Sequence, residues 1–176
     1  MDVPVIFVTH DLREAHLLAE SIAVLDGGAV LQFCPRDETF RRPASRRVAE
    51  LTGVLNLFAS VADRTRVLVD GPPLRVERTP ASVELAGAVD VAIRAERCLL
   101  RRFDPDDPLP ENCFVADIVA DHTFGNSHTL RLTPIGPGPL VEVETAARPY
   151  EVPGVASRAR WVVELPAEDL IVMPRA

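Results

Sequence analysis

The stretch "LVEVET", residues 140–145, alternates uncharged and charged side chains after Leu140. Val141, Val143 and Thr145 fall on one side of an extended chain, and Glu142 and Glu144 fall on the other. A period of two is typical of a strand with one face toward a core and one face toward water. The stretch therefore predicts a half-buried β-strand.

Similar short runs, rich in valine and leucine, occur through the last two thirds of the sequence. They read "TRVLV", "LRVER", "VDVAI", "CFVADIVA", "HTLRL" and "WVVEL", beginning at residues 65, 74, 89, 113, 128 and 161. Proline-rich turn material separates them, including "DPDDPLPEN" at 104–112 and "PIGPGP" at 134–139. Many short strands at close spacing predict a small β-barrel or sandwich. The 104–112 stretch is expected to divide this region into two halves, and no internal repeat is evident.

The first third of the sequence has a different pattern. Val5–Val8 is a continuous apolar run, which predicts a buried strand of a parallel sheet. Asp11 lies three residues before Glu14, the spacing of a capping box at the start of a helix. Because a parallel strand needs neighbours joined by crossovers, Val5–Val8 is expected to be one strand of a larger α/β sheet.

A hairpin and a second helix are expected to follow. Asp26-Gly27-Gly28 lies between two apolar runs, and glycine adopts the positive φ that a tight hairpin turn requires. Pro43 is suited to open a helix, and Gly53 is suited to follow its end. The pattern changes at Gly53, so we expect a domain boundary there.

Composition excludes several classes of function. The net charge of −7 argues against a general nucleic-acid-binding protein, because the phosphate backbone requires clustered positive charge. All 19 basic residues are arginine, so no lysine is present for a Schiff base or a phosphate loop. Cys34, Cys98 and Cys113 are widely spaced and indicate reduced thiols rather than a disulfide framework. No apolar run approaches the ~18 residues of a membrane span, so a soluble intracellular chain is expected.

Residues 4–53 resemble the end of the nucleotide-binding domain of an ABC transporter importer subunit. "VTHD" at 8–11 resembles the switch-histidine loop of that family, and "IAVLDGGAVLQF" at 22–33 resembles its hairpin. "RRPASRRVAELTG" at 41–53 is similar to the linker helix that leads out of the domain.

The rest of the sequence, with "VAIRAERCLL" and "ADHTFGNSHTLRL", is similar to the accessory domain of such subunits. That domain is an oligonucleotide-binding-fold-like barrel, called the transport-associated OB domain. The resemblance implies an α+β chain. Residues 1–53 would be an α/β remnant of the nucleotide-binding domain, and residues 54–176 would form a mostly β, OB-fold-like regulatory barrel.

The resemblance implies that His10 is the switch histidine, which contacts the γ-phosphate and helps to hold the attacking water. Asp11 would mainly cap the following helix. The sequence contains no G-x-x-x-x-G-K-[ST] loop, no "SGGQ"-like signature and no apolar run ending in Asp-Glu. We therefore expect the chain to be a C-terminal piece of an ATPase that is inactive alone. ATP and magnesium would be cofactors of the parent subunit, with none bound by this chain.

A weaker candidate site lies in "FGNSHTLRL". Gly125, Asn126 and Ser127 are expected to form a turn with exposed N–H groups, a geometry that can bind an anion, and Arg131 would add charge. Related accessory domains of molybdate and tungstate importers resemble free-standing molybdate-binding proteins, which hold the oxyanion between barrels. Any hairpin, however, could use a Gly-Asn-Ser turn. His122 and His128 would need one or two further ligands for a zinc site. Asp117 and Asp121 are nearby in the sequence, but strand alternation does not favour their convergence, so no metal site is predicted.

The predicted function is therefore the regulatory portion of an importer ATPase that energises uptake of a solute, with molybdate or tungstate favoured. Iron, thiamine, polyamine, sulfate and sugar importers remain alternatives. The expected partners are membrane permease subunits, a second copy of the chain and a small oxyanion, but not nucleic acid. The expected location is cytoplasmic, at the inner face of the cell membrane. A stand-alone oxyanion-binding or sensing module is the rival interpretation.

Overall fold

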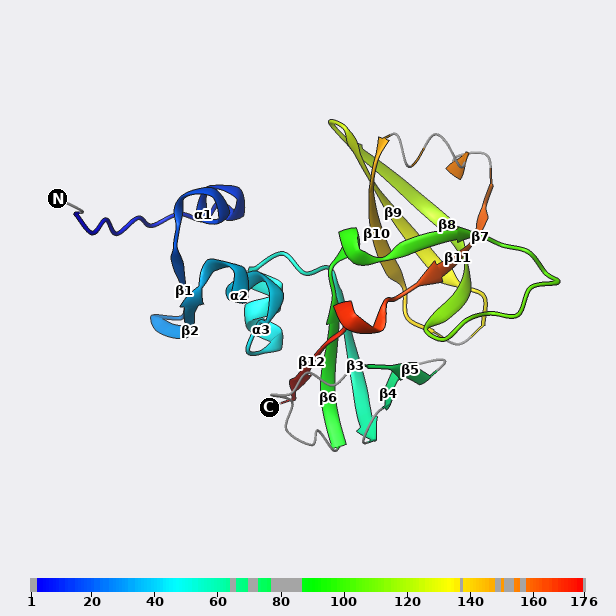
Figure 1. Ribbon diagram of the computed structural model, residues 1–176, viewed down its shortest axis with the longest axis horizontal. Helices are drawn as coiled ribbons and strands as arrows, with labels where there is room; N and C mark the ends of the chain where they lie inside the picture. The colour runs from blue at the N-terminus through cyan, green and yellow to red at the C-terminus, as the bar shows by residue number, and fades with distance from the viewer. Residues whose placement is uncertain are drawn as a thin grey trace. The chain divides into compact units, whose positions relative to one another are not determined.

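A computed structural model describes residues 3–63, 66–69, 73–76, 87–136, 138–147, 150, 154–155 and 158–175 (Figure 1). The chain divides into two compact units, Met1–Gly53 and Val54–Ala176. Each unit is described by itself below. None of the helices in these residues is long and apolar enough to cross a membrane.

The first helix of the first unit, α1, spans Leu12–Leu18 and begins where the capping residue predicts. The Asp11 carboxylate accepts hydrogen bonds from the Arg13 and Glu14 amides at 2.7 and 3.2 Å. These bonds satisfy two of the amide groups that have no partner inside a helix. The predicted cap at Asp11 is therefore confirmed.

The predicted strand at Val5–Val8 is wrong. Residues 3–9 have no regular secondary structure, and Val5, Ile6 and Val8 are 84, 94 and 90% exposed. An isolated apolar segment has no ladder of backbone hydrogen bonds to stabilise an extended strand. The predicted α/β character of residues 1–53 is not confirmed either, since the described part of this unit holds no parallel sheet.

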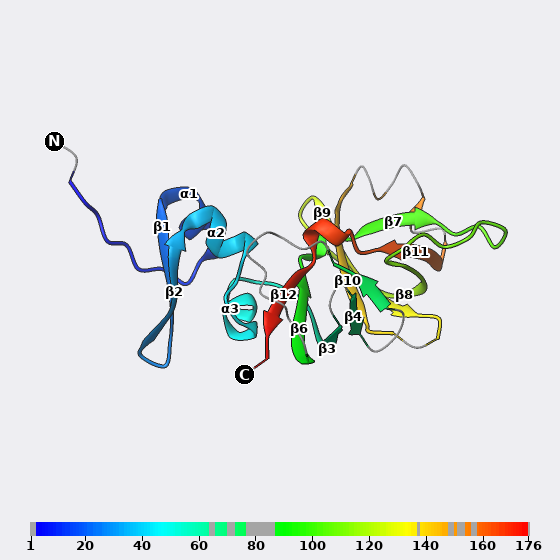
Figure 2. The ribbon, with the colours of Figure 1, turned by 60° about the horizontal axis from the view of Figure 1, so that its bottom comes forward.

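The predicted hairpin forms from strands β1, Ser21–Asp26, and β2, Ala29–Pro35. Asp26 pairs with Ala29, so Gly27 and Gly28 alone make the turn. Their φ angles are +56° and +81°, the sign pattern of a type I′ turn, which only glycine and a few polar residues adopt readily. Figure 2 shows this turn pointing away from α1.

Two further short helices complete the first unit. Helix α2, Arg36–Arg41, was not predicted, and helix α3 spans Arg46–Leu51 within the predicted second helix. Helix α3 begins later than predicted because Ser45 caps it, with its hydroxyl accepting from the Val48 amide at 3.4 Å. Gly53 follows the helix with a φ of +78°, as its predicted position at the helix end requires.

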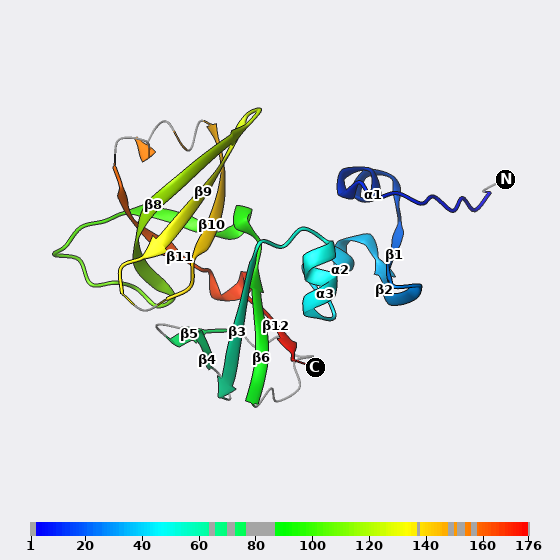
Figure 3. The same cartoon turned by 180° about the vertical axis from the view of Figure 1, so that it is seen from behind.

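The second unit is mostly β, as predicted, and its described residues form two five-stranded antiparallel sheets (Figures 1 and 3). In the first sheet the order is β12-β6-β3-β4-β5, with β3 Asn56–Asp63, β4 Arg66–Val69, β5 Pro73–Arg75, β6 Gly87–Ile93 and β12 Ile171–Pro174. In the second sheet the order is β10-β9-β8-β11-β7, with β7 Leu99–Arg102, β8 Cys113–Phe124, β9 Ser127–Pro134, β10 Val141–Ala146 and β11 Arg160–Glu164. Short 3₁₀ helices η1, Ala95–Arg97, and η3, Ala167–Asp169, precede β7 and β12.

The two sheets have the same connectivity, which the sequence did not reveal. Strands β3, β4, β5 and β6 of the first sheet take the places that β8, β9, β10 and β11 take in the second. In each half a fifth strand, β7 or β12, follows a 3₁₀ helix and joins the sheet of the other half. The sequence interpretation, which found no internal repeat, was therefore incomplete.

The "DPDDPLPEN" stretch does not divide the two halves. It joins β7 to β8, and both of these strands belong to the second sheet. The change of sheet occurs instead between β6 and β7, where η1 leads the chain across. Proline-rich composition predicted the connection correctly, but it does not specify which sheet each flanking strand joins.

One apolar core is shared by the two sheets. The predicted alternation is confirmed in β10, where Val141 and Val143 are buried and Glu144 is exposed. Trp161, Val163 and Leu165 are likewise buried in the same core cluster. Side chains from β3, β4, β5 and β6 belong to this cluster together with side chains from β8, β9, β10 and β11.

Candidate functional site

His10 lies between the extended segment and α1, and its side chain is exposed. The neighbouring polar groups are engaged with one another. The Thr9 hydroxyl donates to the Glu14 carboxylate at 2.6 Å and accepts from the Asp11 amide at 3.0 Å. Hydrogen bonds from the Glu14 and Arg13 amides hold the pKa of Asp11 below its usual value, so this carboxylate stays charged.

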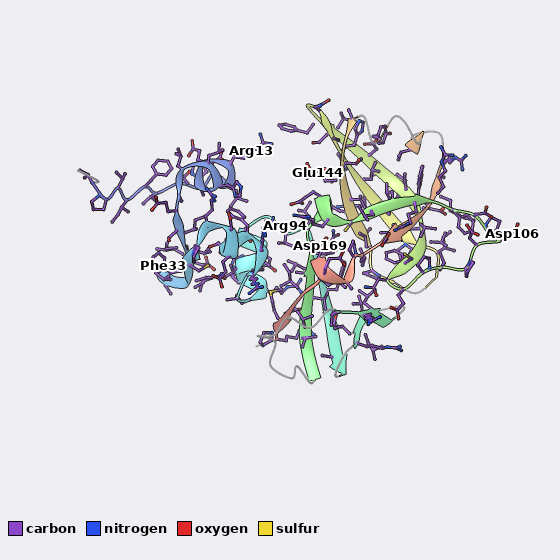
Figure 4. The ribbon with its side chains drawn as sticks, viewed as in Figure 1. Arg13, Phe33, Arg94, Asp106, Glu144 and Asp169 are labelled. Carbon is purple, nitrogen blue, oxygen red and sulfur yellow. The ribbon has the colours of Figure 1, made fainter. Side chains whose placement is uncertain are left out.

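The charged residues nearest His10 in the sequence are two carboxylates and one guanidinium. Asp11 and Glu14 follow His10 within four residues, and their carboxylates are hydrogen-bonded to the Arg13 and Glu14 amides and to the Thr9 hydroxyl. Arg13 projects from α1 (Figure 4), but the sequence has no lysine or phosphate loop to complete the site. No catalytic step is therefore assigned to His10 in this chain.

The Gly125-Asn126 pair makes the turn between β8 and β9, because Phe124 pairs directly with Ser127. Gly125 has a φ of +58°, whereas Asn126 does not have a positive φ, the sign pattern of a type II′ turn. The Asn126 carbonyl accepts from the Ala147 amide at 3.1 Å, which ties the end of β10 to the turn. The Ser127 hydroxyl donates to the Phe124 carbonyl at 3.2 Å.

Arg131 lies apart from this turn. It is four residues beyond Ser127 on β9, a separation of about 13 Å at the rise of a strand. Its guanidinium forms an ion pair with Glu142 of β10, with the nearest N–O distance 2.9 Å. The structure therefore brings Gly125, Asn126 and Ser127 together but does not bring Arg131 to them.

An open depression of about 660 Å³ lies beside Ser127, between β10 on one side and η1 and β7 on the other. Part of its lining is apolar and buried or half-buried, and comes from Cys98, Leu100, Val143 and Val155. The depression runs between the two edge strands of the second sheet, since β7 and β10 end the strand order.

The polar lining of the depression carries both signs of charge. Glu96 and Glu144 contribute carboxylates, and Glu144 projects from β10 in Figure 4. Arg101 contributes a guanidinium that is paired with Glu164 of β11. The hydroxyls of Ser127 and Thr145 complete the polar groups, which can donate to an anion or accept from an amine.

A polar cluster on the inner face of the β8–β9 hairpin was missed by the sequence interpretation. His128 Nδ1 lies 3.1 Å from an Asp121 oxygen, and the Tyr150 hydroxyl donates to the other Asp121 oxygen at 2.5 Å. The His128 and Tyr150 rings are stacked, with centroids 3.7 Å apart and an angle of 6° between their planes. Strand alternation could have placed Asp121 and His128 together, but no periodic signal leads to Tyr150.

This cluster shifts the acid–base behaviour of two of its members. Burial alone would raise the pKa of Asp121, but hydrogen bonds from Tyr150 and His128 outweigh it and hold the pKa below its usual value. The hydrogen bond to Asp121 raises the pKa of Tyr150, because the neutral phenol is the donor.

The histidines do not form a metal site in the described part of the chain. Thr123 is the cross-strand partner of His128, so His122, the residue before Thr123, points to the opposite face of β8. No group of three or more histidine, cysteine or carboxylate side chains with suitable spacing occurs among the described residues. The chemistry of this hairpin is therefore that of hydrogen bonding and ion pairing.

The comparisons with known proteins agree with the resemblance seen in the sequence. No family model matches the chain. A sulfate/thiosulfate import ATP-binding protein of Chromobacterium violaceum is 33% identical over 184 residues, covering 99% of this chain and 46% of the relative. A molybdate/tungstate import ATP-binding protein of Thermococcus kodakarensis is 32% identical over 117 residues, covering 65% of this chain and 33% of the relative.

Among solved structures, the cytoplasmic molybdate-binding protein ModG with molybdate bound has a similar fold. The TM-score is 0.57 at 16% identity, and the match covers 69% of this chain and 98% of that protein. The sequence matches to import proteins cover between 23 and 46% of the relatives' own length. The homologues of this chain are the ATP-binding subunits of ABC importers.

Proposed function

We propose that residues 54–176 are the regulatory accessory domain of an ABC importer ATP-binding subunit, and that residues 3–53 carry the switch-histidine part of its nucleotide-binding domain. The observation that carries this proposal is the 33% identity to an import ATP-binding protein across 99% of the chain. That alignment includes both compact units, so one relationship accounts for the exposed His10 loop and for the two sheets.

In this proposal the whole subunit works at the inner face of the cell membrane with membrane permease subunits. ATP and magnesium belong to the whole subunit, since this sequence has no phosphate loop and no apolar run ending in Asp-Glu. The role of the second unit is regulatory: it binds a small solute or a second copy of the subunit and adjusts transport.

The favoured solute is an oxyanion such as molybdate or tungstate. Support comes from the Thermococcus kodakarensis relative, whose name gives these ions, and from the fold likeness to a protein with bound molybdate. Relatives named for sulfate/thiosulfate and for spermidine/putrescine import keep other substrates as alternatives. The proposed ligand groups are the amides of Gly125, Asn126 and Ser127, with Arg131 adding positive charge to the same hairpin.

Calorimetric titration of the full chain with sodium molybdate tests this proposal. We expect saturable binding of molybdate that exceeds binding of sulfate at equal ionic strength. Ser127→Ala removes a hydroxyl beside the proposed amide donors and is expected to weaken the binding about tenfold, because a hydrogen bond to a charged group contributes about 1.5–3 kcal/mol. Arg131→Ala is expected to weaken the binding by a smaller factor, because Arg131 lies about 13 Å along β9 from Ser127 and acts only through its charge. Thr133→Ala, an exposed change on the same strand, is the matched control and is expected to bind as the original chain does.

If millimolar molybdate gives no heat of binding, the oxyanion is not the ligand, but the relationship to importer subunits still holds. Unchanged binding in Ser127→Ala and Arg131→Ala would instead move the site elsewhere, with the depression beside β10 as the next region to probe.

A second candidate function is a stand-alone oxyanion-binding or sensing module. It is supported by the fold likeness, because the match covers 98% of the molybdate-binding protein. The two functions differ in partners: the importer subunit associates with membrane permease subunits, and the sensing module does not. Co-purification of the chain with permease subunits from detergent-solubilised membranes distinguishes them.

A further inference from the structure

Asn56, the first residue of β3, makes hydrogen bonds to the edge of β10 like those of a neighbouring strand. Its side chain is buried, with 2% of the residue exposed. Its Nδ2 donates to the Glu142 carbonyl and its Oδ1 accepts from the Glu142 amide, both at 2.7 Å. Both polar atoms of the amide are thus used on one residue of the other sheet. These are the two bonds that an adjacent strand would make to the edge of β10.

Asn112, the residue before β8, makes the same pair of bonds from the second sheet to the first. Its Nδ2 donates to the Arg75 carbonyl and its Oδ1 accepts from the Arg75 amide, again at 2.7 Å each. Asn112 is 9% exposed and has a φ of +56°, an uncommon conformation that asparagine tolerates better than most residues. Arg75 lies on β5, the edge strand of the first sheet.

The two asparagines hold equivalent places in the repeated connectivity. Strands β3 and β8 correspond to each other, and so do the edge strands β5 and β10. Each asparagine stands at the beginning of one central strand and binds the edge strand of the other sheet. The sequences around them, "NLF" at 56–58 and "NCF" at 112–114, share the asparagine and the phenylalanine.

We propose that Asn56 and Asn112 are reciprocal locks between the two sheets, each of which opens independently of the other. Opening the Asn56 lock frees the edge of β10 beside the depression, whereas opening the Asn112 lock frees β5. The two locks do not depend on the proposed function, because they are inferred only from the hydrogen bonds between the sheets.

A cysteine lies beside each lock, and the reaction rate of its thiol can report whether that lock is open. The Asn56 amide lies 3.5 Å from the Cys98 sulfur, and Cys98 also lines the depression. Cys113 directly follows Asn112 in the chain and is buried as well. Burial raises the pKa of Cys98 to about 12 and raises the pKa of Cys113, so neither thiol reacts readily while its lock is closed.

The experiment measures the rate of thiol alkylation at each cysteine by peptide mass spectrometry. The full chain is used with Cys34→Ser, since Cys34 lies in the first unit and is half-exposed. We expect Asn56→Ala to raise the alkylation rate of Cys98 about tenfold more than the rate at Cys113. Asn112→Ala is expected to raise the rate at Cys113 by a similar factor relative to the rate at Cys98.

Asn126→Ala, in the exposed β8–β9 turn, is the matched control and is expected to change neither rate. Equal acceleration at both cysteines in either variant overturns independent opening, because it indicates a general loss of stability. Unchanged rates at both cysteines overturn the locks themselves.

Hydrogen exchange in the unsubstituted chain tests the locks even if a variant does not fold. Closed locks predict that the side-chain amide protons of Asn56 and Asn112 exchange with solvent more than tenfold slower than those of Asn126. Equal exchange at the three asparagines contradicts the proposal.

Discussion

The Asn56 side chain binds the backbone amide and the backbone carbonyl of Glu142, with both distances 2.7 Å. Removing this side chain leaves both backbone groups without partners at a half-buried position. We expect Asn56→Ala to lower the free energy of unfolding by about 1–3 kcal/mol, the usual effect of leaving buried polar groups unsatisfied. Urea unfolding followed by the fluorescence of Trp161, the single tryptophan, measures this change.

Asn126→Ala serves as the control for that measurement, since it changes an asparagine in an exposed turn and is expected to alter stability by less than about 0.5 kcal/mol. A similar loss in both variants would show that the bonds to Glu142 carry no particular weight.

The cluster of Asp121, His128 and Tyr150 predicts a delayed titration of the tyrosine. Tyr150 is the single tyrosine, so its ionisation can be followed by absorbance at 295 nm. Its pKa is raised above 10.0, so the stability that this shift of Tyr150 contributes is fully present below pH 10.0. This contribution is lost as the pH rises through the pKa of Tyr150 in the folded chain.

We expect Asp121→Asn to shift the titration of Tyr150 back toward 10.0, because an amide is a weaker acceptor for the phenol than a carboxylate. His122→Ala, on the opposite face of β8, is the matched change and is expected to leave the titration in place. Coincident curves for the original chain and Asp121→Asn would contradict the role of this hydrogen bond.

Local sequence patterns predicted the elements whose signals are local. The alternation of Val141, Glu142 and Val143 predicted the burial of β10, and Asp11 predicted the start of α1. Gly27 and Gly28 predicted a two-residue turn because few other residues adopt their φ angles. In each case the determining interaction lies within a few residues along the chain.

Elements that depend on distant partners were not predicted. The apolar run at Val5–Val8 indicated burial, but composition alone does not show which strand pairs with it, and the described residues supply none. Strand β7 pairs with β11, which lies far along the chain. No sequence pattern near β7 or β12 therefore shows that each joins the sheet of the other half. The same holds for Tyr150, whose contacts with Asp121 and His128 arise only from the folded hairpin.

ATP binding provides a test of the first unit. We expect the purified chain neither to bind a fluorescent ATP analogue at micromolar concentration nor to hydrolyse ATP. The sequence has no phosphate loop, and His10 alone cannot hold a nucleotide. His10→Ala is therefore expected to give the same null result as the original chain. Micromolar binding that His10→Ala abolishes would overturn this expectation.

The second unit is expected to fold without the first. Residues 54–176 contain both five-stranded sheets and the shared apolar core. A chain that begins at Val54 should therefore unfold cooperatively in urea, with Trp161 buried at the start of the transition. A gradual change of fluorescence without a transition would indicate that the first unit is needed for folding.

Self-association is the last expectation, and it follows from the exposed apolar segment at the start of the first unit. Val5, Ile6 and Val8 expose most of their surface, and an unpaired extended segment presents backbone groups that can pair with another chain. The net charge of −7 opposes association, but at physiological salt screening limits that repulsion to roughly 8 Å. Burial of about 800 Å² on each partner is sufficient for a specific dimer.

We therefore expect a homodimer, with light scattering at micromolar concentration giving about twice the chain mass of 19.2 kDa. Ile6→Asp places a charge in the middle of the exposed segment and should shift the equilibrium toward the monomer. Arg13→Asp, an exposed change on α1, is the control for added negative charge and should leave the dimer in place. A monomeric mass for the original chain, with solubility unchanged in Ile6→Asp, would show that this segment does not drive association.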